Sequence, residues 1–120
     1  MKHALVVLTN AVEGREEEFD DWYSNQHLAE VLRIDGFVAA QRFELAPAGD
    51  ADADAPYRYL AIYEVADDKL DDARRALAEA IAEPGRPRMG ASGALADDRC
   101  VWWFTTIGER VSATPATTSG

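Results

Sequence analysis

The residues best suited to chemistry lie in the segment FDDWYSNQHLAEVL, residues 19–32. It contains His27, one of only 2 histidines in the chain, and the adjacent aromatic residues Trp22 and Tyr23. A neutral imidazole accepts a proton near pH 7, as a general base must. The phenol of Tyr23 can donate a hydrogen bond to a substrate or orient it, and the indole of Trp22 can form an apolar wall. The segment therefore predicts an acid/base site at His27 or, as the alternative, a surface histidine at a helix end.

The shape of this helix matters for His27. The aromatic residues and His27 share one side of a helical wheel, whereas the leucine-rich end of the segment occupies the opposite side. One straight helix cannot bury both sides against the same sheet. Residues 24–26 (SNQ) compete for backbone hydrogen bonds, so we expect the helix to bend or end near Asn25. A second helix would then start near Gln26 and place His27 in its first turn, where the dipole favours the neutral ring.

The elements that must position this segment follow from hydrophobic periodicity. Residues 3–10, 37–45, 57–65 and 99–109 predict strands, and residues 13–34 and 67–85 predict helices. This β-α-β-β-α-β order is that of a ferredoxin-like α+β fold, a four-stranded antiparallel sheet with the helices on one face. The other face needs a partner, which a homodimer packed sheet against sheet would supply. We expect one domain over residues 1–110 and a flexible tail over residues 111–120.

Several strand residues are candidates for contacts with a ligand. Asn10 ends the first strand, where it would reach into a cavity or simply cap a turn. The aromatic side chains on the later strands would wall a pocket, or pack in the core or a dimer interface. These are Tyr59, Tyr63, Trp102 and Phe104.

Alternation along residues 37–45 predicts which side chains share a face. Phe37 and Phe43 fall on one face, and Arg42 and Glu44 on the other. We expect Arg42 to pair across strands with Glu44 or Glu64.

The remaining reactive residue types offer less. His3 is expected to be a surface residue at a frayed strand start, and Cys100, in the apolar run RCVWWF, a buried structural thiol. The loop RPRMGASGALADD, residues 86–98, is either a lid that presents cations to a substrate or simply disordered.

Composition and charge restrict the partners. The net charge is −10, with 22 acidic against 12 basic residues and no basic stripe, which argues against nucleic acid and against anionic membranes. No apolar run is long enough for a signal peptide or a membrane span, so a cytoplasmic location is expected. The histidines and the lone cysteine lack ligand spacing and no glycine-rich phosphate motif occurs, so neither metal nor cofactor is expected.

The order of these features resembles a known family. Trp22-Tyr23, a histidine four residues after the tyrosine, and the Asp35-Gly36 turn before the second strand resemble the EthD-like branch of the dimeric α+β barrel superfamily. The similarity spans residues 3–110, although Ala29 stands where relatives often have proline. The resemblance implies a dimer and a cavity between sheet and helices. It also implies an acid/base role for His27, as proposed in several relatives. These include muconolactone methylisomerases, cofactor-independent quinone-forming monooxygenases and polyketide cyclases.

The sequence thus favours a cofactor-independent isomerase, cyclase, lyase or monooxygenase that acts on a small apolar or aromatic metabolite. His27 would move a proton next to a carbonyl or phenol, and Tyr23 would donate or orient. The alternative is a non-catalytic ligand-binding or accessory dimer of the same fold, because one fold hosts many functions. Haem chemistry is a third hypothesis, since distant members of the superfamily bind haem.

Overall fold

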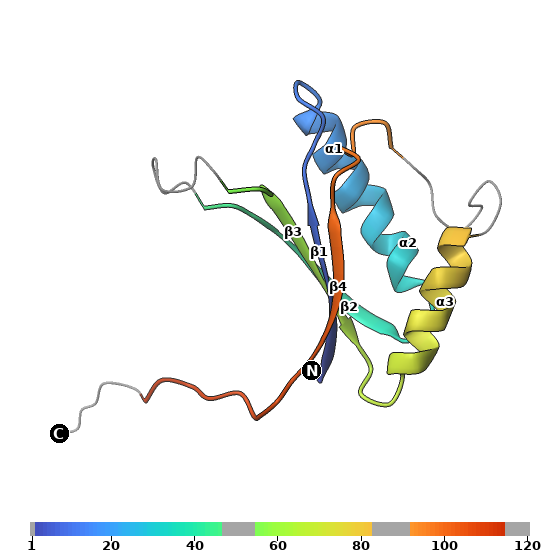
Figure 1. Cartoon of the computed structure of the whole chain (residues 1–120), viewed down its shortest axis with the longest axis vertical. Helices are drawn as coiled ribbons and strands as arrows, with labels where there is room; N and C mark the ends of the chain where they lie inside the picture. Colours follow the sequence, from blue (N-terminus) through green and yellow to red (C-terminus); the bar gives the residue numbers. More distant parts are fainter. Residues whose placement is uncertain (1, 47–54, 83–91, 115–120) are drawn as a thin grey trace.

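The computed structural model describes residues 2–46, 55–82 and 92–114 (Figure 1). The strands are β1 (His3–Thr9), β2 (Phe37–Glu44), β3 (Tyr59–Val65) and β4 (Cys100–Thr105). The helical elements are α1 (Glu16–Trp22), the π-helical turn η1 (Tyr23–His27), α2 (Leu28–Leu32) and α3 (Leu70–Ala82).

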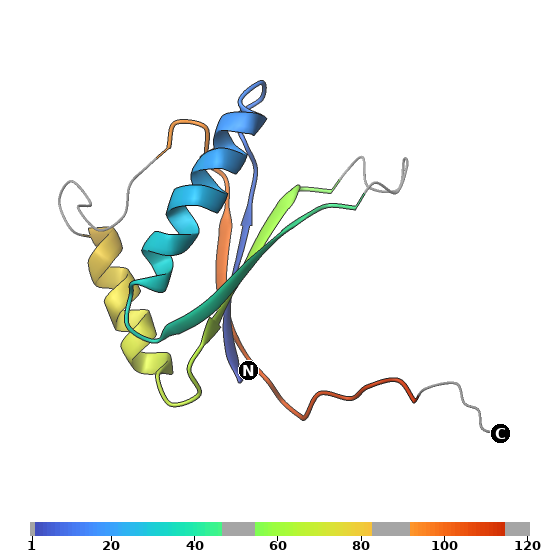
Figure 2. The same ribbon diagram turned by 180° about the vertical axis from the view of Figure 1, so that it is seen from behind.

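All four strands form one antiparallel sheet in the order β2-β3-β1-β4. Both views show the helices on the same side of this sheet (Figures 1 and 2). The ferredoxin-like α+β fold predicted from the order of elements is therefore confirmed. Within the described ranges, no helix has the length and apolar character needed to cross a membrane.

The core lies between the helices and the inner face of the sheet. In β3 the odd-numbered residues, from Tyr59 to Val65, are buried and the even-numbered ones are only partly so, the alternation typical of a strand with one covered face. Phe19 of α1 and Ala73 of α3 have no exposed surface and close this layer. The small side chain of Ala73 allows α3 to approach the turn before β2. There Gly36 has φ +98°, and a Cβ on it would lie 2.7 Å from the Ala73 Cβ.

A register shift in β2 overturns the faces expected for this strand. The pairing with β3 shifts between Phe37 and Ala39, so the residues before and after the shift change sides. Phe37 is buried beneath the helices, whereas Phe43 is 41% exposed on the outer face. Alternation alone placed Phe37 and Phe43 on one face, because the sequence pattern does not show where a strand contains an extra residue.

Two other expectations were wrong. His3 is 8% exposed rather than a surface residue, and its Nδ1 lies 2.8 Å from the Thr105 hydroxyl on β4. The strand therefore does not fray at this position, since its imidazole is held across the sheet. Cys100 is half-buried rather than buried, and its thiol donates to the Tyr57 hydroxyl at 3.2 Å.

Candidate functional site

The helix that carries His27 contains one widened turn. The Leu28 amide donates to the Tyr23 carbonyl, five residues back, and both ends of η1 keep right-handed helical φ and ψ. We expected the helix to bend or end near Asn25; it is instead continuous through residues 24–26 and has a widened turn there. His27 consequently does not lie at a free helix N-terminus, and the dipole argument for its neutral form does not apply.

The π-turn places the imidazole of His27 on the indole of Trp22. The two rings stack with centroids 4.6 Å apart and an interplanar angle of 20°. The Tyr23 ring meets His27 edge-on, with centroids 4.9 Å apart and planes at 87°. Two aromatic walls at right angles fix the orientation of the imidazole, whose side chain remains 16% exposed.

A carboxylate lies beside the same ring. Glu30 Oε1 is 3.6 Å from His27 Nδ1, and the Glu30 side chain is 11% exposed. An acidic group this close to a partly buried imidazole stabilises the imidazolium formed on protonation.

The hydroxyl of Tyr23 lies in the buried core. The Tyr63 hydroxyl donates to it at 3.2 Å, and both side chains are buried. Burial raises the pKa of Tyr23 above its ordinary value, opposed by this hydrogen bond and by the charge of Arg42. Burial, with the neighbouring Tyr23 second, also raises the pKa of Tyr63. Both phenols are therefore held neutral.

Arg42 of β2 ties the sheet to the helix at the start of the π-turn. Its guanidinium donates to Ser24 Oγ at 2.9 Å and to Asp20 Oδ1 at 3.0 Å. It lies over the Tyr23 ring at 4.8 Å from the centroid, and its side chain is 15% exposed. The cross-strand pairing expected with glutamate is absent among the described residues, because the register of β2 turns Arg42 toward α1.

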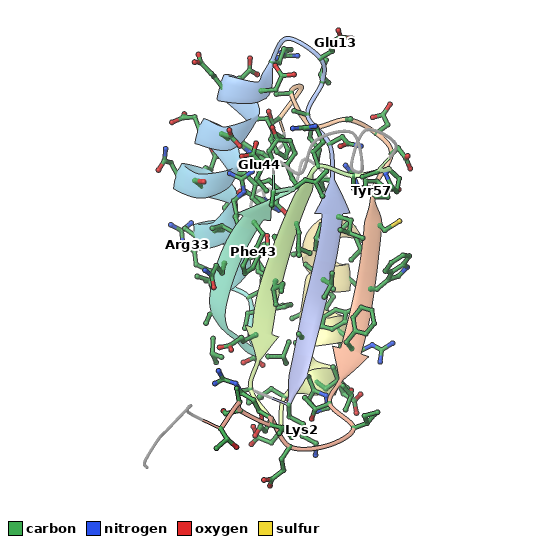
Figure 3. All side chains as sticks on the ribbon, turned by 90° about the vertical axis from the view of Figure 1, so that its left-hand side faces the viewer. Lys2, Glu13, Arg33, Phe43, Glu44 and Tyr57 are labelled. Carbon is green, nitrogen blue, oxygen red and sulfur yellow. The ribbon has the colours of Figure 1, made fainter. Side chains whose placement is uncertain are left out.

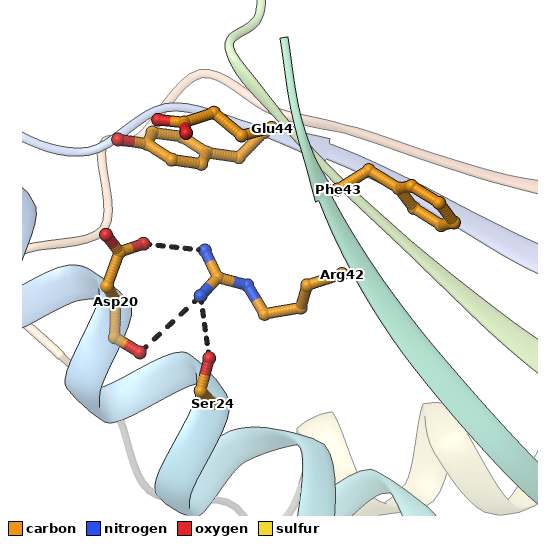
Figure 4. A pocket seen from close by; sticks show the side chains of 6 residues that line it. Asp20, Ser24, Arg42, Phe43 and Glu44 are labelled. Carbon is orange, nitrogen blue, oxygen red and sulfur yellow. Dashed lines mark hydrogen bonds and ion pairs between the residues drawn. The ribbon is translucent and has the colours of Figure 1, made fainter. Parts of the chain in front are cut away.

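These contacts form one wall of an open polar pocket of about 270 Å³ (Figure 4). The figure shows the Arg42 guanidinium directed at Asp20 and Ser24, with Phe43 on the far side of the strand. The pocket lining is Asp20, Ser24, Arg42, Phe43, Glu44 and Tyr59. Burial raises the pKa of Tyr59, and the nearby carboxylate of Asp20 adds to this effect.

The structure brings together only some of the residues predicted for the site. Trp22, Tyr23 and Tyr63 surround or support His27, whereas Asn10 holds the chain before β3. The Asn10 amide donates to the Pro56 carbonyl at 2.8 Å and accepts from the Arg58 amide at 2.9 Å.

Trp102 and Phe104 lie on the outer face of the sheet, away from the helices, and are 51% and 52% exposed. Trp103, one residue along, packs against the core instead, with its ring 5.9 Å from that of Phe37.

Glu30 and Arg42 are the site residues that the sequence did not reveal. Glu30 follows His27 by three residues, a helical spacing that could have suggested the pair. Across the described parts of the chain, no three histidine, cysteine, aspartate or glutamate residues are grouped so that they could hold a metal ion.

Comparison with known proteins bears on the fold. No protein-family model matches the chain, and no curated protein matches it. A mutant of MhuD, solved with two manganese protoporphyrin IX molecules per active site, has a TM-score of 0.61 and 15% identity, over 92% of this chain and 99% of that one. An ethyl tert-butyl ether D (EthD) family protein from Bacillus halodurans C-125 has a TM-score of 0.48 and 18% identity. The match covers 92% of this chain and 100% of that one.

At such identities a shared architecture is what the likeness establishes. The strand order, the helices on one face and the match to MhuD agree on that architecture. The chain has the ferredoxin-like α+β fold.

Proposed function

We propose that the chain is a small-molecule enzyme in which His27 accepts and returns a proton. The observation that carries the proposal is the fixed imidazole, stacked on Trp22 at 4.6 Å with Glu30 Oε1 3.6 Å from its Nδ1. A general base needs a fixed ring, a nearby charge that stabilises its protonated form and some access to solvent. His27 has all three.

Trp22 adds a hydrogen-bond donor beside this base. The indole Nε1 is buried and has no hydrogen-bond partner in the described parts of the chain. A buried N–H without a partner costs free energy, which an acceptor oxygen on a ligand would recover. This supports a substrate with a carbonyl or phenol oxygen, whose acidic C–H or O–H proton His27 would remove. Isomerisation, cyclisation, elimination and quinone-forming oxygenation without a cofactor all begin with this step.

The wider proposal is a homodimer that binds a small molecule between sheet and helices. The MhuD mutant, which shares the fold, supports binding of this kind, since it holds porphyrin molecules in its active site. The EthD-like pattern at Trp22, Tyr23 and His27 supports the same assignment. A cytoplasmic location stays a prediction from the sequence.

The two histidines of the chain provide a matched test. Wild type, His27→Gln and His3→Gln are incubated with a panel of phenols, lactones and β-diketones, and products are detected by mass spectrometry. We expect product with wild type and His3→Gln and at least about a hundredfold less with His27→Gln, the usual contribution of a general base. His3 is held at Thr105 and lies outside the proposed chemistry, so it controls for the loss of an imidazole. Full turnover by His27→Gln would overturn the proposal.

The alternative, a non-catalytic binding protein, predicts a different outcome of the same experiment. Panel members would then raise the melting temperature of wild type and His27→Gln equally, and no product would form. Haemin serves as a separate probe, because a porphyrin complex of MhuD shares this fold. If haemin shows a Soret shift with wild type but not with His27→Gln, the proposed function would change to haem binding.

A further inference from the structure

The outer face of the sheet is apolar and open. Its large exposed side chains include Phe43, Trp102 and Phe104, which are between 41% and 52% exposed. Figure 3 looks onto this face, on which Phe43 is labelled. Judged by the strand register, Glu64 is the only charged residue at an outward position of the described strands. In a chain with a net charge of −10, this face is where another acidic molecule meets the least repulsion.

A segment after β4 projects on the same side. Residues 106–114, here called the C-terminal arm, leave the sheet opposite the helices and extend away from it (Figures 1 and 2). Its start is fixed, since the Thr106 amide donates to the Lys2 carbonyl at 2.8 Å. Beyond this bond, Ile107 is 106% exposed and Val111 is 91% exposed. Both apolar side chains are therefore almost fully open to solvent in one copy of the chain.

The arm is long enough to reach a second layer. An extended segment of this length spans roughly 30 Å, whereas two sheets packed face to face lie about 10 Å apart. Between the arm and the sheet is a hollow of about 790 Å³, lined by Glu64 of β3 and by Thr106, Gly108, Glu109 and Arg110 of the arm. The arm therefore lies at the edge of the open face, next to the space that a second sheet would fill.

We propose that the C-terminal arm clasps a second copy of this chain and buries Ile107 and Val111 against its flank. The inference rests on the proposed homodimer and adds the arm as a contact of its own. A second copy is the occupant that matches what this face offers, because it carries the same mostly apolar surface. A two-fold axis between the sheets also gives each copy one arm to receive. Arg110 and Glu64 border the same hollow and supply opposite charges at its rim.

The test measures the dimer dissociation constant of the full chain by sedimentation velocity across a dilution series. The arm variant is Ile107→Ser/Val111→Ser, and the control is Ile81→Ser on α3. Ile81 is also exposed, at 45%, but belongs to the helical layer. We expect the arm variant to raise the constant at least about tenfold and the control to leave it unchanged. Hydrogen exchange adds a direct reading of the arm, whose amides should become protected only at concentrations where dimers form.

The outcomes separate the arm from the dimer. An unchanged constant in the arm variant would overturn the clasp while the homodimer stands. A wild type that remains monomeric at every concentration would overturn both. Arm amides that are protected in the monomer would show that the arm folds on its own chain, which also contradicts the proposal. Neither arm residue is buried within one copy, so the variant should fold normally, as far-UV circular dichroism would verify.

Discussion

Removal of the Arg42 guanidinium should destabilise the fold far more than removal of an ordinary surface arginine. Arg42→Met keeps most of the apolar stem but deletes the hydrogen bonds to Asp20 Oδ1 at 3.0 Å and Ser24 Oγ at 2.9 Å. Hydrogen bonds to a charged group contribute about 1.5–3 kcal/mol, and the low end applies because Asp20 is 51% exposed and regains water. The lost cation–π contact with Tyr23 adds about 0.5–1 kcal/mol.

The expected loss in the free energy of unfolding is therefore about 2–3 kcal/mol, or a fall in melting temperature on the order of 10 °C. Urea denaturation followed by far-UV circular dichroism measures it. Arg75→Met is the matched control, because Arg75 Nη1 lies 3.5 Å from Asp72 Oδ1 in an exposed pair of α3. Such a pair contributes about 0.5 kcal/mol or less. If the two variants lose the same stability, Arg42 does not clamp the π-turn to the sheet.

Three further outcomes follow from single contacts. Gly36→Ala should lower the free energy of unfolding by more than about 2 kcal/mol, because φ is +98° and the new Cβ would lie 2.7 Å from that of Ala73. Gly14→Ala is the control: φ is +84° but nothing lies within 4 Å of the new Cβ, so the loss should be only about 1 kcal/mol. Thermal melts measure both. Since burial raises the pKa of Tyr63 above 10.0, the folded chain keeps a proton that the unfolded chain loses. Its stability should be complete below pH 10 and fall above it, and Tyr63→Phe should flatten this slope in urea melts across that range. Asn10→Ala removes hydrogen bonds to two backbone groups ahead of β3 and should lower stability by about 1–2 kcal/mol; a loss below about 0.3 kcal/mol would contradict the role assigned to this amide.

The order of strands and helices along the chain could be predicted, because apolar period and turn residues act locally. Which side chains of two strands face the core could not be predicted. In β2 the shift after Phe37 exchanges the sides, so Phe43 points outward and Arg42 inward. In β4 the tryptophans are adjacent, and alternation does not say which one is buried. The register with β1 decides it, since Trp103 pairs with buried Leu5. Both outcomes depend on a neighbouring strand, which the local pattern does not contain.

The helix of the candidate site was predicted in outline for a physical reason that also limits the prediction. Two apolar arcs on one segment require some irregularity between them, and SNQ was the place where it occurs. A break would have satisfied the pattern equally well, because propensity does not distinguish a broken helix from a widened one. The π-turn became visible only through the hydrogen bond from Leu28 back to Tyr23.

The widened turn decides which groups a site at His27 contains. In a regular α-helix, residues five apart are rotated by about 140°, so Trp22 and His27 would point to different sides. One residue added to a single turn brings them into register, and their rings stack. The same addition rotates the following turn, so that Phe19 before it and Val31 after it are both buried against the sheet. A regular helix would separate the two rings and would also turn Phe19 and Val31 to different sides. The π-turn keeps the stack and these core contacts, and so the aromatic wall of the proposed base comes from the same helix as the base itself.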